Sequence, residues 1–195
     1  MNYEEFRKSL RMRLVDMEYE DRVFNPVFYK PVDCGYALAV YAATPIPWNM
    51  GNSDITVGKI MDDAERNFRL WCKPVLNTIA GFLFGDETTN LFTGNAEYVD
   101  DGGFCCLTTE DRVFGAAALF LPGIKERIAE IFDADYYVLP SSVHEVLVLP
   151  DKGKITPAEL TDMVKSINGS EVSPEDRLGE RVLYYRRSTG KLERT

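Results

Sequence analysis

The sequence predicts an α+β protein in which helices pack on a mainly antiparallel sheet. Apolar residues recur at helical spacing in several segments and form short strand-like runs in others. Two of these runs are separated by a tight Pro-Ser-Ser turn, and another pair closes the chain around Ser188-Thr189-Gly190, as expected of antiparallel neighbours. The length of 195 residues suits one generous domain or two small ones.

Helical periodicity dominates the first 85 residues. Residues 3–17 place apolar side chains three and four positions apart between charged ones, which predicts one helix with a narrow apolar stripe. A second helix is predicted from Val57 to Trp71, with Asp63 on its charged face. Pro74 interrupts that pattern, and residues 75–84 resume it as a further helical segment.

Two strand-like runs lie between the first two helical segments. Residues 27–29 are bracketed by prolines, which suits an edge strand or a short extended piece. Residues 35–43 are almost wholly apolar and suit a central strand, although their alanines leave a buried helix as an alternative. Residues 44–53 hold two prolines, a glycine and two asparagines, so they predict a loop.

The chain divides best at residues 86–103. This stretch is polar and rich in glycine and aspartate, which predicts a loop or linker between an N-terminal α+β part at 1–85 and a C-terminal α+β part at 104–195. In the second part, residues 104–109 predict a strand and residues 110–112 a turn. The apolar run at 113–121 fits either a strand or a helix.

The rest of the C-terminal part is more regular. Pro122 and Gly123 open a predicted helix, and two strands follow at 136–139 and 143–149. Thr156-Pro157-Ala158-Glu159 is a capping box with proline at the first helical position, and Asn168-Gly169 is a stop signal. A short helical turn is predicted at 173–176, and a closing hairpin at 181–187 and 191–194.

Composition and charge disfavour several classes of function. The chain carries 22 Lys plus Arg against 31 Asp plus Glu, a net charge of −9, so we expect no nucleic-acid partner. The single histidine, His144, rules out metal sites that need two imidazoles and leaves at most one Ser–His or Cys–His pair. No glycine pattern typical of dinucleotide or phosphate binding occurs. We therefore expect no metal and no cofactor.

The compartment follows from the N-terminus, the apolar runs and the cysteines. The chain starts with polar and acidic residues, unlike a secretory signal. No apolar run approaches the roughly 18–20 residues that cross a bilayer. The four cysteines lie in apolar surroundings without a Cys-x-x-Cys pair. These features predict an acidic cytoplasmic protein with free buried thiols and no membrane association.

Residues 140–145 hold the densest set of candidate catalytic side chains. On a strand, Ser142 and His144 would share one face and Glu145 the other. A small hydrolase or transferase could use Ser142, His144 and Glu145, with an acid from residues 97–101 orienting the histidine. Against this, such i, i+2 side chains run parallel about 6–7 Å apart, and no Gly-x-Ser-x-Gly elbow is present. The alternative is a tight hairpin whose serines stabilise the turn.

No complete catalytic, metal or phosphate-binding set emerges from these motifs. The leading hypothesis is therefore a non-catalytic binding or regulatory module that acts through contacts with a protein partner. The hydrolase or transferase built around Ser142, His144 and Glu145 is the first alternative. The second is an acidic decoy of a nucleic-acid enzyme, which would present carboxylates in place of phosphates.

A distinctive run, Leu-Pro-Ser-Ser-x-His-Glu-Val, occupies residues 139–146, and Gly-Ala-Ala at 115–117 and Leu-Pro-Gly at 121–123 precede it. With these motifs, residues 104–187 resemble an uncharacterised family from anaerobic gut Firmicutes that carries only a domain-of-unknown-function label. The stretch from Trp71 to Asp101 is shorter than the central region of that family. The resemblance implies an α+β fold and a bacterial cytoplasmic protein, and it implies no reaction.

Overall fold

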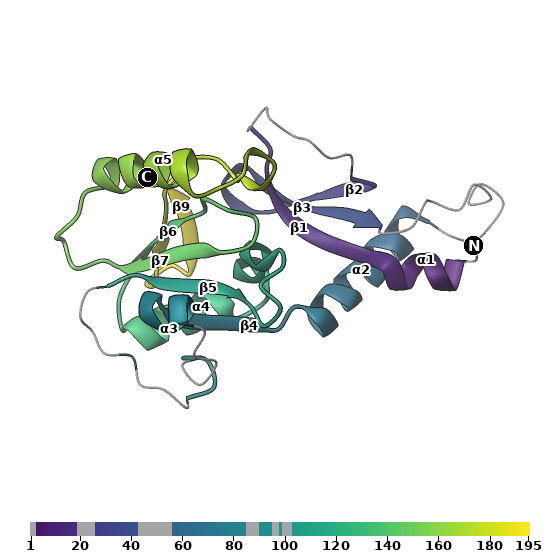
Figure 1. The fold of residues 1–195 in the computed structure, drawn as a ribbon. Coiled ribbons are helices and arrows are strands. Elements are labelled where there is room, and N and C mark those ends of the chain that lie inside the picture. Colours follow the sequence, from purple (N-terminus) through teal and green to yellow (C-terminus); the bar gives the residue numbers. More distant parts are fainter. Residues whose placement is uncertain (1–2, 19–25, 43–55, 85–89, 95–97, 99–102) are drawn as a thin grey trace.

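Two antiparallel sheets and the helices packed on them make up the fold. The computed structural model describes residues 3–18, 26–42, 56–84, 90–94, 98 and 103–195. Within these residues the smaller sheet has the strand order β1-β3-β2, and the larger sheet has the order β4-β5-β7-β6-β8-β9. Figure 1 shows the smaller sheet with α1 and α2 at one end of the molecule, and the larger sheet with α3, α4 and α5 at the other. The predicted α+β class is confirmed.

The first element is a short helix that continues directly into a strand. Helix α1 spans Tyr3–Ser9 and strand β1 spans Leu10–Asp16, so the single helix expected over residues 3–17 is wrong beyond Ser9. Along β1, Leu10, Met12 and Leu14 are buried while the arginines between them are half-buried. Apolar residues four positions apart lie on one face of a helix and also on one face of a strand, where the period is two residues. Pairing with β3 decides in favour of the strand.

The smaller sheet is completed by two strands that the sequence predicted. Strand β2 (Phe28–Pro31) pairs only with β3 (Tyr36–Ala42), which lies in the centre of the sheet, and the short helix η1 (Asp33–Gly35) connects them. The edge strand and the central strand are thus confirmed. The loop expected at 44–53 lies outside the described residues.

Helix α2 (Val57–Trp71) covers the smaller sheet and begins at Thr56, whose hydroxyl accepts a hydrogen bond from the backbone of Lys59. The expected solvent position of Asp63 is wrong, because this carboxylate is buried. It accepts a hydrogen bond of 2.7 Å from the hydroxyl of Tyr3 and lies in an ion pair with Arg66. One carboxylate of a charge-rich stretch is thus buried, because the Tyr3 hydroxyl of α1 donates a hydrogen bond to it.

The helix predicted at 75–84 is wrong for residues 75–78, which form a strand, and is confirmed for residues 79–84. Strand β4 (Pro74–Thr78) leads into the short helix α3 (Ile79–Phe84), and β4 pairs with β5 (Cys105–Thr109). Pro74 is the first residue of an edge strand, a position where its missing N–H is tolerated. The larger sheet therefore contains a strand from the first 85 residues. The division of the chain at 86–103 stays a prediction.

The remaining elements follow the expected order. The ambiguous run at 113–121 forms a 3₁₀ helix, the strand expected from residue 143 begins at Val146, and the capping box of Thr156 and Glu159 is confirmed. The closing hairpin and the short turn before it are also confirmed. The bounds are η4 (Gly115–Phe120), α4 (Ile124–Phe132), β6 (Tyr136–Leu139), β7 (Val146–Pro150), α5 (Pro157–Ser170), η5 (Pro174–Asp176), β8 (Leu183–Arg186) and β9 (Lys191–Arg194).

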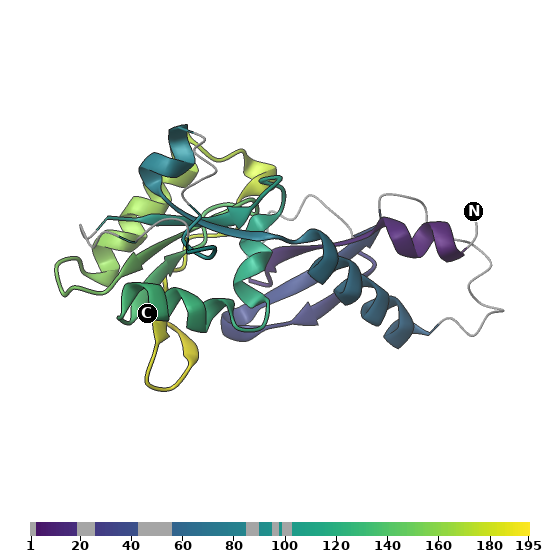
Figure 2. The same cartoon turned by 90° about the horizontal axis from the view of Figure 1, so that it is seen from below.

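One continuous core joins the two sheets. It contains buried side chains from β1, β3 and α2 together with others from β5, β6, β7, η4 and α4. Helix η4 contacts both β1 and β5, and Figure 2 shows it between the two sheets. A second cluster lies on the opposite face of the larger sheet, under Leu160 and Val164 of α5. Among the described residues, no helix has the length and apolar character needed to cross a membrane.

Candidate functional site

The segment that carries Ser142 and His144 is a turn that precedes β7. Ser142 forms only an isolated bridge with Arg177, and its buried hydroxyl accepts a hydrogen bond of 3.0 Å from the backbone N–H of His144. This is the contact expected if the serine stabilises the turn. Glu145 is half-buried, and within the described structure no hydrogen bond joins it to Ser142 or His144.

The imidazole of His144 lies between a backbone donor and a carboxylate. Its Nδ1 accepts a hydrogen bond of 3.2 Å from the backbone N–H of Phe114, and its Nε2 lies 3.3 Å from Oδ1 of Asp176. Because Nδ1 is an acceptor, the ring proton of the neutral form is on Nε2, where it faces Asp176. The acid beside the histidine thus comes from η5. Of the acids in the expected loop, Glu97, Asp100 and Asp101 lie outside the described residues.

Close backbone packing holds the His144 turn against η4. The hydroxyl of Thr108 donates to the backbone oxygen of His144 at 2.8 Å. A Cβ atom on Gly115 would lie 2.5 Å from that same oxygen and 2.7 Å from Cα of Thr108, so only glycine fits. Phe114, just before it, has a left-handed φ of 53°, and its ring stacks on the imidazole with centroids 5.4 Å apart.

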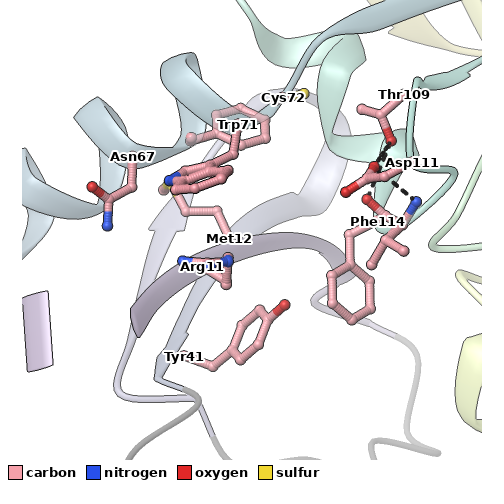
Figure 3. Close-up of a pocket in the computed structure, with 11 residues that line it drawn as sticks. Arg11, Met12, Tyr41, Asn67, Trp71, Cys72, Thr109, Asp111 and Phe114 are labelled. Atoms are coloured by element: carbon pink, nitrogen blue, oxygen red, sulfur yellow. Dashed lines mark hydrogen bonds between the residues drawn. The ribbon is translucent and has the colours of Figure 1, made fainter. Parts of the chain in front are cut away.

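Phe114 connects this turn to a cavity of about 320 Å³ between the two sheets. Figure 3 shows side chains from four parts of the chain around it: Arg11 of β1, Tyr41 of β3, Trp71 of α2 and Phe114. We call this the aromatic cavity. The other lining residues are Met12, Asn67, Phe68, Cys72, Thr109, Asp111 and Val113.

Aromatic rings and the guanidinium group of Arg11 line the aromatic cavity, and Arg13 lies behind one of these rings. The guanidinium carbon of Arg11 lies 5.2 Å from the Trp71 ring centroid, and that of Arg13 lies 5.3 Å from the Phe114 centroid. The rings of Tyr41 and Phe114 meet edge to face at 5.5 Å. Such contacts orient flat side chains without closing the space between them.

Burial keeps the Cys72 thiol and the Tyr41 hydroxyl of the aromatic cavity in their neutral forms. It raises the pKa of the Cys72 thiol to about 12 and the pKa of the Tyr41 hydroxyl to about 12, although Arg11 and Arg13 oppose the second shift. A protonated thiol and phenol are poor nucleophiles. The carboxylate of Asp111 accepts hydrogen bonds from Thr109 and from the backbone of Val113. The walls are therefore suited to binding.

The mouth of the aromatic cavity is apolar and open to water. Trp71 is 62% exposed and Val113 is 48% exposed, although both line the cavity. Large apolar side chains in such a position, beside a concave surface, mark a contact site in many soluble proteins.

Within the described part of the chain, no group of three or more His, Cys, Asp or Glu side chains could hold a metal ion. All four cysteines are free, and Cys72, Cys105 and Cys106 are buried.

No pattern in the sequence indicated the aromatic cavity. Periodicity placed Arg11 on the charged face of a helix and Trp71 in the apolar stripe of another, and no motif gave a function to Tyr41 or Phe114. The only signal was a tryptophan in the last turn of α2, just before Pro74. That position alone does not distinguish a core side chain from an exposed one.

Comparison with known proteins adds one finding. Residues 47–187 match the model of a family of unknown function (DUF5688), and this match covers more than half of the chain. The chain belongs to this family. The matched segment contains Trp71, Phe114 and His144, whereas Arg11 and Tyr41 precede it. The match extends further toward the N-terminus than the resemblance over 104–187. No curated protein and no solved structure matches the chain.

Proposed function

We propose that this protein is a non-catalytic binding module, and that a protein partner inserts a large apolar side chain into the aromatic cavity. The observation that carries this proposal is the group of Trp71, Tyr41 and Arg11 around one open cavity. Trp, Tyr and Arg are the residue types that contribute most binding energy at protein interfaces. Here they converge from three separate elements.

The shape of the site favours a protein over a small molecule. A volume of about 320 Å³ is at the lower end of ligand pockets and accommodates one large side chain. A small molecule of that size would leave the exposed parts of Trp71 and Val113 in water. A partner surface around the inserted side chain would cover both, and the burial of this apolar area would stabilise the complex.

A hydrolase or transferase is the second candidate, and the pair of His144 and Asp176 is the observation that favours it. An imidazole beside a carboxylate is part of many general-base systems. However, Nδ1 of His144 already accepts from the backbone N–H of Phe114, and Nε2 faces Asp176. The hydroxyl of Ser142 accepts from the backbone N–H of His144. His144 could act as a base toward Ser142 only if the contact between Nδ1 and Phe114 broke.

The resemblance to a family of anaerobic gut Firmicutes supports a bacterial, cytoplasmic setting for the proposed contact. The resemblance rests on the motif at residues 139–146, which includes the turn that positions His144. His144 accepts a hydrogen bond from the backbone of Phe114, and Phe114 lines the aromatic cavity. The two features are therefore joined in one structural unit.

The test is a selection of random peptides displayed on phage against the full chain. We expect the selected peptides to share a large apolar residue, and a synthetic peptide of that sequence to bind at least about tenfold more weakly to the Trp71→Ala variant. Leu70→Ala is the matched control, because Leu70 is 66% exposed beside Trp71 but does not line the cavity. Peptides that bind both variants and the unaltered chain equally, or no selected peptide at all, would overturn the proposal.

A further inference from the structure

A second cavity of about 320 Å³ lies beside the edge of the larger sheet and is independent of the proposed function. Strands β4 and β5, helix α3 and the turn after β5 form its walls. Of its described lining residues only Thr109 also lines the aromatic cavity. Its lining includes Val75, Asn77, Phe82, Thr108, Glu110 and Arg112.

Asn77 is a polar residue on an otherwise apolar face of the larger sheet. The register places it beside Cys106, which pairs with Leu147, which pairs in turn with Leu139. Both leucines belong to the apolar cluster under α5, so the face is otherwise apolar at this level. An aliphatic residue would be expected at position 77 from the packing alone.

The side-chain oxygen of Asn77 is buried without a hydrogen-bond partner. The residue is only 5% exposed, and its Oδ1 accepts no hydrogen bond from any of the residues that the structure describes. A buried acceptor left in this state destabilises the fold, because it has lost its hydrogen bonds to water without replacement. Because the side chain lines the cavity, a ligand with an N–H group can supply the missing donor.

Side chains of opposite charge line the same cavity. Arg112 is held by a hydrogen bond of 3.2 Å to the backbone oxygen of Phe82, and its guanidinium carbon lies 4.8 Å from the Phe82 ring centroid. Glu110 also lines the cavity and is in an exposed ion pair with Lys73 at 3.2 Å. A purely anionic ligand would meet Glu110, and a purely cationic one would meet Arg112.

The floor of the cavity offers acceptors, and one wall is apolar. The hydroxyl of Thr108 donates its proton to the backbone of His144, so toward the cavity its oxygen can only accept. Together with Asn77 it favours a ligand group that carries several N–H bonds. The side chains of Val75 and Phe82 supply an apolar surface in the same space.

We propose that this cavity binds a free α-amino acid. The carboxylate lies at Arg112, and the ammonium group donates to Asn77 Oδ1 and Thr108, with Glu110 balancing its charge. The side chain of the amino acid packs against Val75 and Phe82. A zwitterion is the small ligand that satisfies the buried acceptor and both charges at once.

The test is calorimetric titration of the full chain with each common amino acid at millimolar concentration. We expect binding of one or a few amino acids with apolar side chains. The N-acetyl derivative and the methyl ester of each binder, which lack one of the two charges, should bind at least about tenfold more weakly. Absence of any binding, or equal binding of the derivatives, would overturn the proposal.

Two variants locate the site. Arg112→Met and Asn77→Leu should each weaken binding at least about tenfold. Arg186→Met is the matched control, because Arg186 also lies over an aromatic ring, at 5.3 Å from Tyr184, but away from the cavity. Without ligand, Asn77→Leu should melt at the same temperature as the unaltered chain or higher, since it removes the unpaired acceptor. Unchanged binding in both variants would contradict the assignment.

Discussion

The two ends of strand β1 lie in contrasting regions of the same junction between the sheets. Asp16, at its C-terminal end, belongs to what we call the ionic clamp, formed by Asp16, Glu18, Arg181 and Arg194. Arg11, near its N-terminal end, lines the aromatic cavity. The first region is closed and its charges are paired, whereas the second is open and its Trp71 ring faces water.

The ionic clamp ties the smaller sheet to the terminal hairpin. Arg181 contacts Asp16 and lies 2.7 Å from Glu18, and Arg194 contacts Glu18 and donates to the backbone oxygen of Cys34 at 3.1 Å. Asp16 is only 5% exposed, and a Cβ atom on Gly179 would lie 2.8 Å from its carboxylate. Such crowding leaves no room for a partner.

This contrast suggests different roles for the side chains of the ionic clamp and those of the aromatic cavity. The charges of the ionic clamp are paired with one another, so the loss of one of them should affect folding. The side chains of the aromatic cavity surround unfilled space, and some of them expose apolar surface. The loss of one of these side chains should therefore affect contact with a partner. Four measurements test this division.

The largest effect is expected for Arg181→Leu. This change leaves the buried carboxylate of Asp16 without its cation, and breaking a buried pair in this way costs about 3–5 kcal/mol. Urea unfolding measures the loss. Arg186→Ala, which removes an exposed pair with Glu193 at 3.5 Å, should cost less than about 1 kcal/mol. Equal effects of the two changes would mean that the ionic clamp contributes no more than a surface ion pair.

Gly115→Ala should have the next largest effect, on the cavity side. A Cβ atom there meets the backbone of His144 and Thr108, which cannot move apart without disturbing η4 or β5, so we expect a loss of about 1–3 kcal/mol. Gly58→Ala in α2, where the nearest atom is at 3.7 Å, should instead stabilise the chain by up to about 1 kcal/mol. Thermal unfolding of both variants tests whether the open cavity has a rigid wall.

Local signals in the sequence predicted the elements that local contacts determine. The capping box of Thr156 and Glu159 and the prolines around β2 specify backbone conformation within a few residues. The predictions failed at 10–16 and 75–78, where pairing with a distant strand overrides a spacing that also fits a helix.

The candidate sites were harder to predict from the sequence, because they too depend on contacts between distant parts of the chain. Ser142 and His144 are neighbours along the chain, so they were found, but Asp176, which lies beside the His144 ring, comes from a later turn. The aromatic cavity requires β1, β3, α2 and the start of η4 to converge. No spacing within one segment contains that information, because it depends on sheet register and on how the sheets pack.

Acid should weaken the ionic clamp by a smaller amount than Arg181→Leu does. Hydrogen bonds from Arg194 and then Arg181 lower the pKa of Glu18 below its ordinary value of 4.5, against the opposing effect of burial. A carboxyl group with a lowered pKa stabilises the fold above its unfolded-state pKa, and this contribution is lost as the pH falls through the folded-state value. Melting temperatures of the unaltered chain and of Glu18→Gln should therefore converge below about pH 4.5. A difference that stays constant to pH 3 would assign the effect to packing.

The smallest change in stability is expected for Trp71→Ala, although this variant should lose peptide binding. Most of the indole already faces water, and its contact with Arg11 at 5.2 Å is an exposed cation–π pair, so urea unfolding should change by less than about 1 kcal/mol. A loss of several kcal/mol would place Trp71 in the core that joins the sheets and would remove the distinction between the two ends of β1. A small loss together with abolished binding would show that the exposed ring is retained for a contact outside this chain, because the fold does not need it.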